Sequence, residues 1–134
     1  MRARSAVMLA AAAGFSGVAL GAFGAHGLKQ VLEPKWLAIY QTGVQYHLVH
    51  AVVLLAVGLV MTQPLPQICR LWLVRAAWAL LVGLLLFSGS LYVLAVSGVS
   101  AIGSITPIGG ISWLVAWWSI GMAGLRFSPG VINR

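Results

Sequence analysis

The side chains best suited to chemistry in this sequence are three histidines, His26, His47 and His50. Imidazole groups can ligate a metal, hold a haem iron from its axial positions, or exchange a proton near neutral pH. The chain offers few partners for such chemistry, because it contains one acidic residue, Glu33, and one cysteine, Cys69. A structural metal site and a nucleophilic triad both need more thiolate or carboxylate groups than this. We therefore expect no catalytic residues, no metal and no resident cofactor.

Further hydrogen-bonding side chains fall near the histidines. At 3.6 residues per turn, Tyr46, His47 and His50 lie on one side of a helix, and Ser88 and Tyr92 share a face of another. Polar groups in lipid are costly unless they find partners, so we expect these residues to converge between helices. The expected polar cluster consists of His26, Gln41, Gln45, Tyr46, His47, His50, Ser88, Ser90, Tyr92 and Thr106.

The polar cluster is open to three functional interpretations. The first is a hydrogen-bond network that locks neighbouring helices together. The second is the transport or sensing of a proton or small solute through this cluster of His, Tyr and Ser side chains, which we expect in the outer leaflet. The third is binding of haem or a quinone. We favour the first, because no acid accompanies the histidines in a conventional relay and short helices leave little room for a porphyrin.

Four apolar runs must position these side chains. They cover about residues 5–24, 43–61, 76–96 and 107–125, and each approaches the roughly 20 residues that span a bilayer. None alternates like a membrane β-strand, and helices satisfy their own backbone groups in lipid. The first run exceeds the usual apolar part of a signal peptide. The sequence therefore predicts an all-α membrane four-helix bundle that forms one integral domain over residues 1–134.

The composition indicates the same class of protein. Apolar residues make up 61% of the chain and charged residues 7%, with a mean hydropathy of +1.01. Soluble domains are about a quarter charged, so these residues cannot cover a water-facing surface. A soluble enzyme is excluded on this ground. The single cysteine also excludes a disulfide-rich secreted fold.

The basic residues indicate an orientation in the membrane rather than a nucleic-acid site. The net charge is +7, but the cations lie between the apolar runs and form no patch. The positive-inside rule places the more basic side in the cytoplasm. We expect a multi-pass protein of a bacterial inner (plasma) membrane with both termini cytoplasmic. The side of the termini holds Arg2, Arg4, Arg70, Arg75, Arg126 and Arg134, and the other side holds Lys29 and Lys35.

The connections between the runs are short. A short interfacial helix is expected after the first span, and Pro34 is expected to end it, because the residue before a proline avoids the helical region. Residues 62–70 contain two prolines and predict a tight turn. Thr106 followed by Pro107 is typical of a helix N-cap and first turn.

Stripes of small residues mark the first and last helices. Gly17 and Gly21 form a GxxxG pair, and small residues let helix backbones approach closely in lipid. The stripes predict packing within the bundle, with self-association as the alternative. The positions are Gly14, Gly17, Gly21 and Gly24 on the first helix and Gly109 and Ala116 on the last.

Four motifs resemble the YgdD-type family of small inner-membrane proteins. They are GAFGAHGL at 21–28, YQTGVQYHLVH at 40–50, LFSGSLY at 86–92 and TPIGG at 106–110. The resemblance spans nearly the whole chain and implies four transmembrane helices, but the family is one of unknown function and implies no reaction. The stripes of small residues and the small mass outside the membrane lead us to expect a protein that is not an enzyme but a small subunit, assembly or interaction protein. Its expected partners are the lipid bilayer and either a homo-oligomer or a larger membrane complex, and not nucleic acid.

Overall fold

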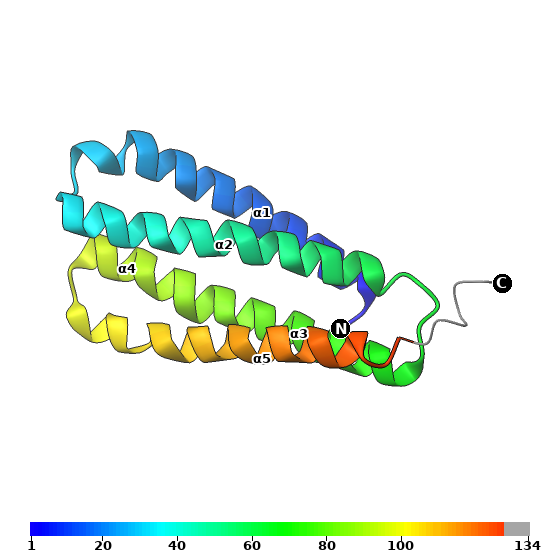
Figure 1. The fold of residues 1–134 in the computed structure, drawn as a ribbon. Coiled ribbons are helices and arrows are strands. Elements are labelled where there is room, and N and C mark those ends of the chain that lie inside the picture. The colour runs from blue at the N-terminus through cyan, green and yellow to red at the C-terminus, as the bar shows by residue number, and fades with distance from the viewer. Residues whose placement is uncertain (128–134) are drawn as a thin grey trace.

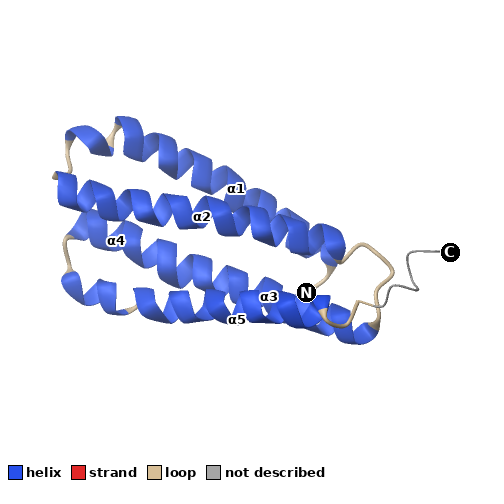
Figure 2. Ribbon diagram, in the orientation of Figure 1, coloured by secondary structure: helices blue, strands red, loops and turns tan. Residues whose placement is uncertain are grey.

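The chain folds into four long helical rods. The computed structural model describes residues 1–127, and within that range it contains helices and no strand (Figures 1 and 2). The third rod is a continuous helix with one π-helical turn, η2 (Leu84–Ser88), near its middle. The rods are α1 (Ala3–His26), α2 (Pro34–Val60), the run of α3 (Gln67–Gly83), η2 (Leu84–Ser88) and α4 (Gly89–Ser97), and α5 (Thr106–Gly124).

All four rods are long and apolar enough to cross a membrane. Helices suit this solvent because lipid offers no hydrogen bonds to a free backbone N–H or carbonyl. The predicted fold class, an all-α membrane bundle of four helices, is therefore confirmed. The expected spans 5–24, 43–61, 76–96 and 107–125 each fall on one rod, and the second and third rods begin well before them.

Two predictions about the helix ends are wrong. Pro34 begins α2 instead of ending a helix, because proline fits the first turn, where its missing N–H has no role. The expected interfacial helix is consequently reduced to one 3-10 turn, η1 (Leu28–Gln30). At α5 the N-cap is Ile105, and Thr106 is already helical. A second 3-10 turn, η3 (Ser100–Ser104), leads into α5.

The rods pair into two antiparallel hairpins. α1 packs along α2, and α5 packs along α3 and η2. The hairpins meet where α2 contacts α3, η2 and α4 (Figure 1). We call the end with connections 27–33 and 98–105 the distal end. The proximal end carries Met1 and connection 61–66.

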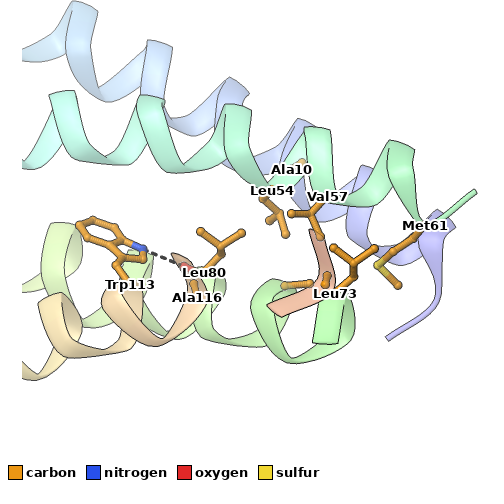
Figure 3. Close-up of a cluster of buried hydrophobic side chains, with 10 residues drawn as sticks. Ala10, Leu54, Val57, Met61, Leu73, Leu80, Trp113 and Ala116 are labelled. Atoms are coloured by element: carbon orange, nitrogen blue, oxygen red, sulfur yellow. Dashed lines mark hydrogen bonds between the residues drawn. The ribbon is translucent and has the colours of Figure 1, made fainter. Parts of the chain in front are cut away.

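The apolar core lies between the hairpins in the proximal part of the bundle. Leu54 and Val57 of α2 and Met61, which follows α2, face Leu73 and Leu80 of α3 (Figure 3). All five are at most 4% exposed. Many other large apolar side chains remain exposed on the outer faces of the rods, as expected where the surrounding solvent is lipid.

Glycines allow α1 to approach α2 closely. Gly17, Gly21 and Gly24 all face α2 side chains, and an added Cβ at Gly24 would lie 2.6 Å from the Tyr40 ring. Such a distance is shorter than van der Waals contact, so only glycine fits. Gly14 differs, because an added Cβ there would meet nothing within 4 Å.

The last helix makes an equally close approach to η2. An added Cβ at Gly109 would overlap the backbone nitrogen of Phe87. Ala116, two turns further along α5, is fully buried in the core. Gly109 and Ala116 therefore serve packing within this chain.

Candidate functional site

His47 lies at the centre of a hydrogen-bond network in the bundle. Its side chain is 3% exposed, and its Nδ1 lies 3.0 Å from the hydroxyl of Tyr92. Its Nε2 lies 3.4 Å from Oγ of Ser16. Because Ser16 Oγ donates to the Ala13 carbonyl, we assign Nε2–H as the donor to Ser16 and Nδ1 as the acceptor from Tyr92. The imidazole thus connects α1, α2 and α4.

A pair of tyrosines extends this network toward the distal end. The Tyr40 hydroxyl donates to the Leu20 carbonyl on α1 at 2.8 Å, and its ring lies 5.0 Å from the ring of Tyr92. Glycines make room for both rings, since an added Cβ at Gly43 would lie 2.9 Å from Tyr92. We call Ser16, Tyr40, His47 and Tyr92 the core network.

His50 belongs to a different environment. Its Nδ1 lies 2.8 Å from the Tyr46 carbonyl, which can only accept, so Nδ1 carries the proton. The ring stacks on the indole of Trp113, with centroids 3.7 Å apart and planes 4° apart. His50 is 6% exposed, and within residues 1–127 its ring makes no hydrogen bond to His47. The two histidines therefore hold opposite tautomers in separate sites.

Aromatic rings surround His50 between α2 and α5. The Tyr46 ring lies nearly parallel to that of Trp113, with centroids 5.7 Å apart. Phe87 of η2 packs on Trp113 at 4.7 Å, and Trp117 meets His50 edge-on at 6.5 Å. These rings line a groove of about 480 Å³, which we call the aromatic groove. The site is neutral, because its lining includes no charged residue.

Two serines of the third rod, Ser88 and Ser90, differ in their hydrogen-bond partners. The Ser90 hydroxyl lies 2.6 Å from that of Thr106, which ties α4 to the start of α5. Ser88, at the end of η2, is completely buried. Its Oγ is the one fully buried side-chain N or O atom with no hydrogen-bond partner in the described part of the chain.

The structure does not bring three of the expected residues into the bundle. His26 ends α1 and is exposed, and Gln41 and Gln45 are exposed on α2. The two glutamines border a shallow recess beside Gly21 and Gly24. Among residues 1–127, no three histidine, cysteine or acidic side chains lie close enough to hold a metal ion.

Sequence reasoning missed residues of both sites. Ser16 and Tyr40 are half of the core network, and Trp113 is the stacking partner of His50. A polar residue in the middle of the apolar first helix is the available signal for Ser16. The Trp113 indole has a second anchor, because its Nε1–H donates to the Leu80 carbonyl at 3.1 Å (Figure 3).

The apolar rods and the buried histidine network define the class: a small polytopic α-helical membrane protein. Residues 20–110 match the family model described as "Protein of unknown function (DUF423)", and the chain belongs to that family. This range covers His47, His50 and Tyr92.

Bacterial membrane proteins are similar to this chain over most of its length. The UPF0382 membrane protein YwdK of Bacillus subtilis is 40% identical over 90% of this chain and 96% of its own. A UPF0382 membrane protein of Haemophilus influenzae is 43% identical over 88% and 91%. The inner membrane protein YgdD of Escherichia coli is 37% identical over 87% and 86%, which confirms the expected resemblance. No solved structure matches the chain.

Proposed function

We propose that this chain is a non-enzymatic membrane subunit that acts by packing its helices against other membrane proteins or further copies of itself. The observation that carries the proposal is the outer face of α1. This helix packs chiefly on α2, and its opposite face exposes alanines at positions 11, 12, 19 and 22 around the larger side chains of Met8 and Phe15. Small side chains are typical of helix–helix contacts in lipid, where close approach of backbones supplies the attraction.

Gly14 supports the same surface. Unlike the glycines that contact α2, it has no atom within 4 Å of an added Cβ, so packing within the chain does not account for it. The short connections add to the argument, because the described residues offer little surface outside the rods for a partner to bind. The partners we propose are lipid and a homo-oligomer or larger membrane complex.

The core network supports a structural role for His47 rather than transport. Both ring nitrogens have protein partners, Tyr92 and Ser16, so a passing proton or solute would have to displace them. Transport through the histidines is the competing function. It predicts that His47→Ala or His50→Ala lowers proton flux into proteoliposomes, whereas our proposal predicts unchanged flux.

We also propose that the proximal end faces the cytoplasm. Arg70 and Arg75 lie near that end, where Arg70 donates to the Met61 carbonyl at 3.1 Å and Arg75 lies 4.7 Å from the Trp72 ring. Arginines and tryptophans are typical of membrane interfaces, and the excess of cations marks the cytoplasmic one. Arg134, which the sequence also places on the side of the termini, lies outside the described residues.

Disulfide crosslinking in native membranes tests the proposed surface. Single cysteines at Ala12 and Ala19 of α1, in a Cys69→Ala background, should form a covalent dimer or an adduct with another protein on mild oxidation. The matched control is Val52→Cys on α2, which is 67% exposed and lies outside the proposed α1 surface. If the α1 cysteines give only monomer, or crosslink no better than Val52→Cys, the proposed surface is wrong.

A further inference from the structure

The aromatic groove has the form of a small-molecule site that opens toward the surrounding lipid. Its volume of about 480 Å³ falls within the range of roughly 300–1,000 Å³ typical of ligand sites. His50 and Trp113 are buried, at 6% and 4% exposure, and form its floor. Tyr46 and Trp117 border it and are 43% and 50% exposed.

His50 presents one polar atom there. Its Nδ1–H is committed to the Tyr46 carbonyl, which fixes Nε2 as an acceptor without a hydrogen. Nε2 has no hydrogen-bond partner among residues 1–127, and it is not fully buried. His50 lines the groove, and Nε2 is the imidazole nitrogen left to accept a hydrogen bond from a ligand there.

The remaining lining defines the rest of the ligand. Flat rings prefer stacked or edge-on contact with aromatic side chains, and Tyr46, Phe87 and Trp117 offer such surfaces. Pro107, Gly110 and Leu114 leave the mouth apolar and free of charge. A charged ligand would find no counter-ion, whereas an apolar chain attached to the ring would extend into lipid.

We propose that the aromatic groove binds the reduced ring of a lipid-soluble quinol, whose hydroxyl donates a hydrogen bond to Nε2 of His50. The matching oxidised quinone has carbonyl acceptors only, and two acceptors cannot share a hydrogen bond, so it lacks this contact. The Tyr46 hydroxyl and the Trp117 Nε1–H also border the groove, but they can donate to an oxygen of either redox form. The site therefore distinguishes the two redox forms by binding alone. A phenol on an apolar chain has the same donor chemistry, and the experiment below includes it. This inference is independent of the proposed α1 surface.

Binding to the full chain in synthetic-lipid nanodiscs tests the proposal. Decylubiquinol and decylubiquinone are titrated under argon by calorimetry, with empty nanodiscs subtracted. One neutral hydrogen bond predicts that the quinol binds about three- to tenfold more tightly than the quinone. 4-Nonylphenol separates the two sources of this chemistry. Weaker binding than the quinol assigns the site to quinols, and equal or tighter binding overturns that assignment in favour of simple phenols.

Variants locate the preference at one atom. His50→Ala should reduce the ratio of the two affinities to about one, and His50→Gln, whose amide can donate, should reduce it or reverse it. His26→Ala, at an exposed histidine, should keep the wild-type ratio.

Gly110→Leu is a second test of the site in case the His50 variants fold poorly. It fills the groove and leaves the imidazole in place. An added Cβ at Gly110 meets only the Phe87 ring, at 3.8 Å, so the helix tolerates it. Both ligands should then bind at least about tenfold more weakly, while circular dichroism stays unchanged. A wild-type protein with no saturable binding, with no preference for the quinol, or with a preference that survives His50→Ala would overturn the proposal.

Discussion

At the scale of single residues, a hydroxyl on one helix decides whether one nitrogen of a buried imidazole on another helix has a partner. Tyr92→Phe removes the group that donates to Nδ1 of His47 and leaves this buried acceptor unpaired. Interhelical hydrogen bonds in membranes are worth about 0.5–2 kcal/mol, so we expect the free energy of unfolding to fall by that amount. Unfolding by SDS titration in mixed micelles, followed by circular dichroism, measures the change.

Tyr46→Phe is the matched control for this prediction, because that ring is 43% exposed and its hydroxyl has no partner in the described structure. It should leave the unfolding free energy within about 0.5 kcal/mol of wild type. A double mutant of Tyr92→Phe with Ser16→Ala should lose less than the sum of the single losses, since both groups bind one imidazole. Strict additivity would contradict the core network.

Removing the Ser88 hydroxyl should have the opposite effect on stability. Its buried Oγ has no partner among residues 1–127, and such a group costs about 1–3 kcal/mol of desolvation. We therefore expect Ser88→Ala to raise the free energy of unfolding, by about 1 kcal/mol. Ser90→Ala is the contrasting change, because it removes a hydrogen bond to Thr106 and should destabilise. The same SDS titration compares them, and a clear loss of stability in Ser88→Ala would show that its hydroxyl has a partner in the membrane.

At the scale of elements, close backbone contacts at glycines set the spacing of the rods. Gly109→Ala places a Cβ on the backbone of Phe87, which cannot turn aside as a side chain would. Separating α5 from η2 should cost about 1–3 kcal/mol, as overpacking does elsewhere. The thermal midpoint in detergent should fall accordingly.

Gly121→Ala provides the control on the same helix, because an added Cβ there meets nothing within 4 Å. Alanine is the better helix former by up to about 1 kcal/mol, so this change should keep or raise the midpoint. Equal midpoints for the two variants would mean that α5 does not contact η2 as closely as described.

The sequence predicts some of this arrangement and not the rest, for physical reasons. Helical spacing places Ser88 and Tyr92 on one face, which makes a contact between Tyr92 and a neighbouring helix foreseeable. The π-helical turn Leu84–Ser88 is not foreseeable, because its residues are almost all apolar and carry no periodic signal. The pairing of His50 with Trp113 depends on how the two hairpins dock, which local pattern does not encode.

At the scale of the whole molecule, the solvent determines the fold class more than any motif does. Four apolar runs without charge allow only helices in lipid, so the bundle was predictable from composition and run length. The helix ends were not, because Pro34 can either end a helix or begin one. A related reason applies to His26, which the sequence predicts in the polar cluster: no local signal shows that it falls on the exposed last turn of α1.

The same whole-molecule view gives a prediction about orientation. Connection 61–66 and the first residues of the chain lie at the proximal end, where arginines gather, and connection 98–105 lies at the distal end. Because cationic segments are retained in the cytoplasm, the proximal end should face inward. A cysteine at Gln63 should then escape a membrane-impermeant maleimide until the cells are opened, whereas one at Ser100 should react in spheroplasts.

Both reporter positions are exposed, so burial within the fold cannot cause a difference in their labelling. The native Cys69 is fully buried and should add no background labelling. Cells opened by detergent should label both equally and serve as the reference. If Gln63→Cys reacts in intact spheroplasts and Ser100→Cys does not, the bundle has the opposite orientation. The cations at 70 and 75 would then anchor the proximal end without determining its side, and their hydrogen bond to Met61 and contact with Trp72 would suffice to account for them.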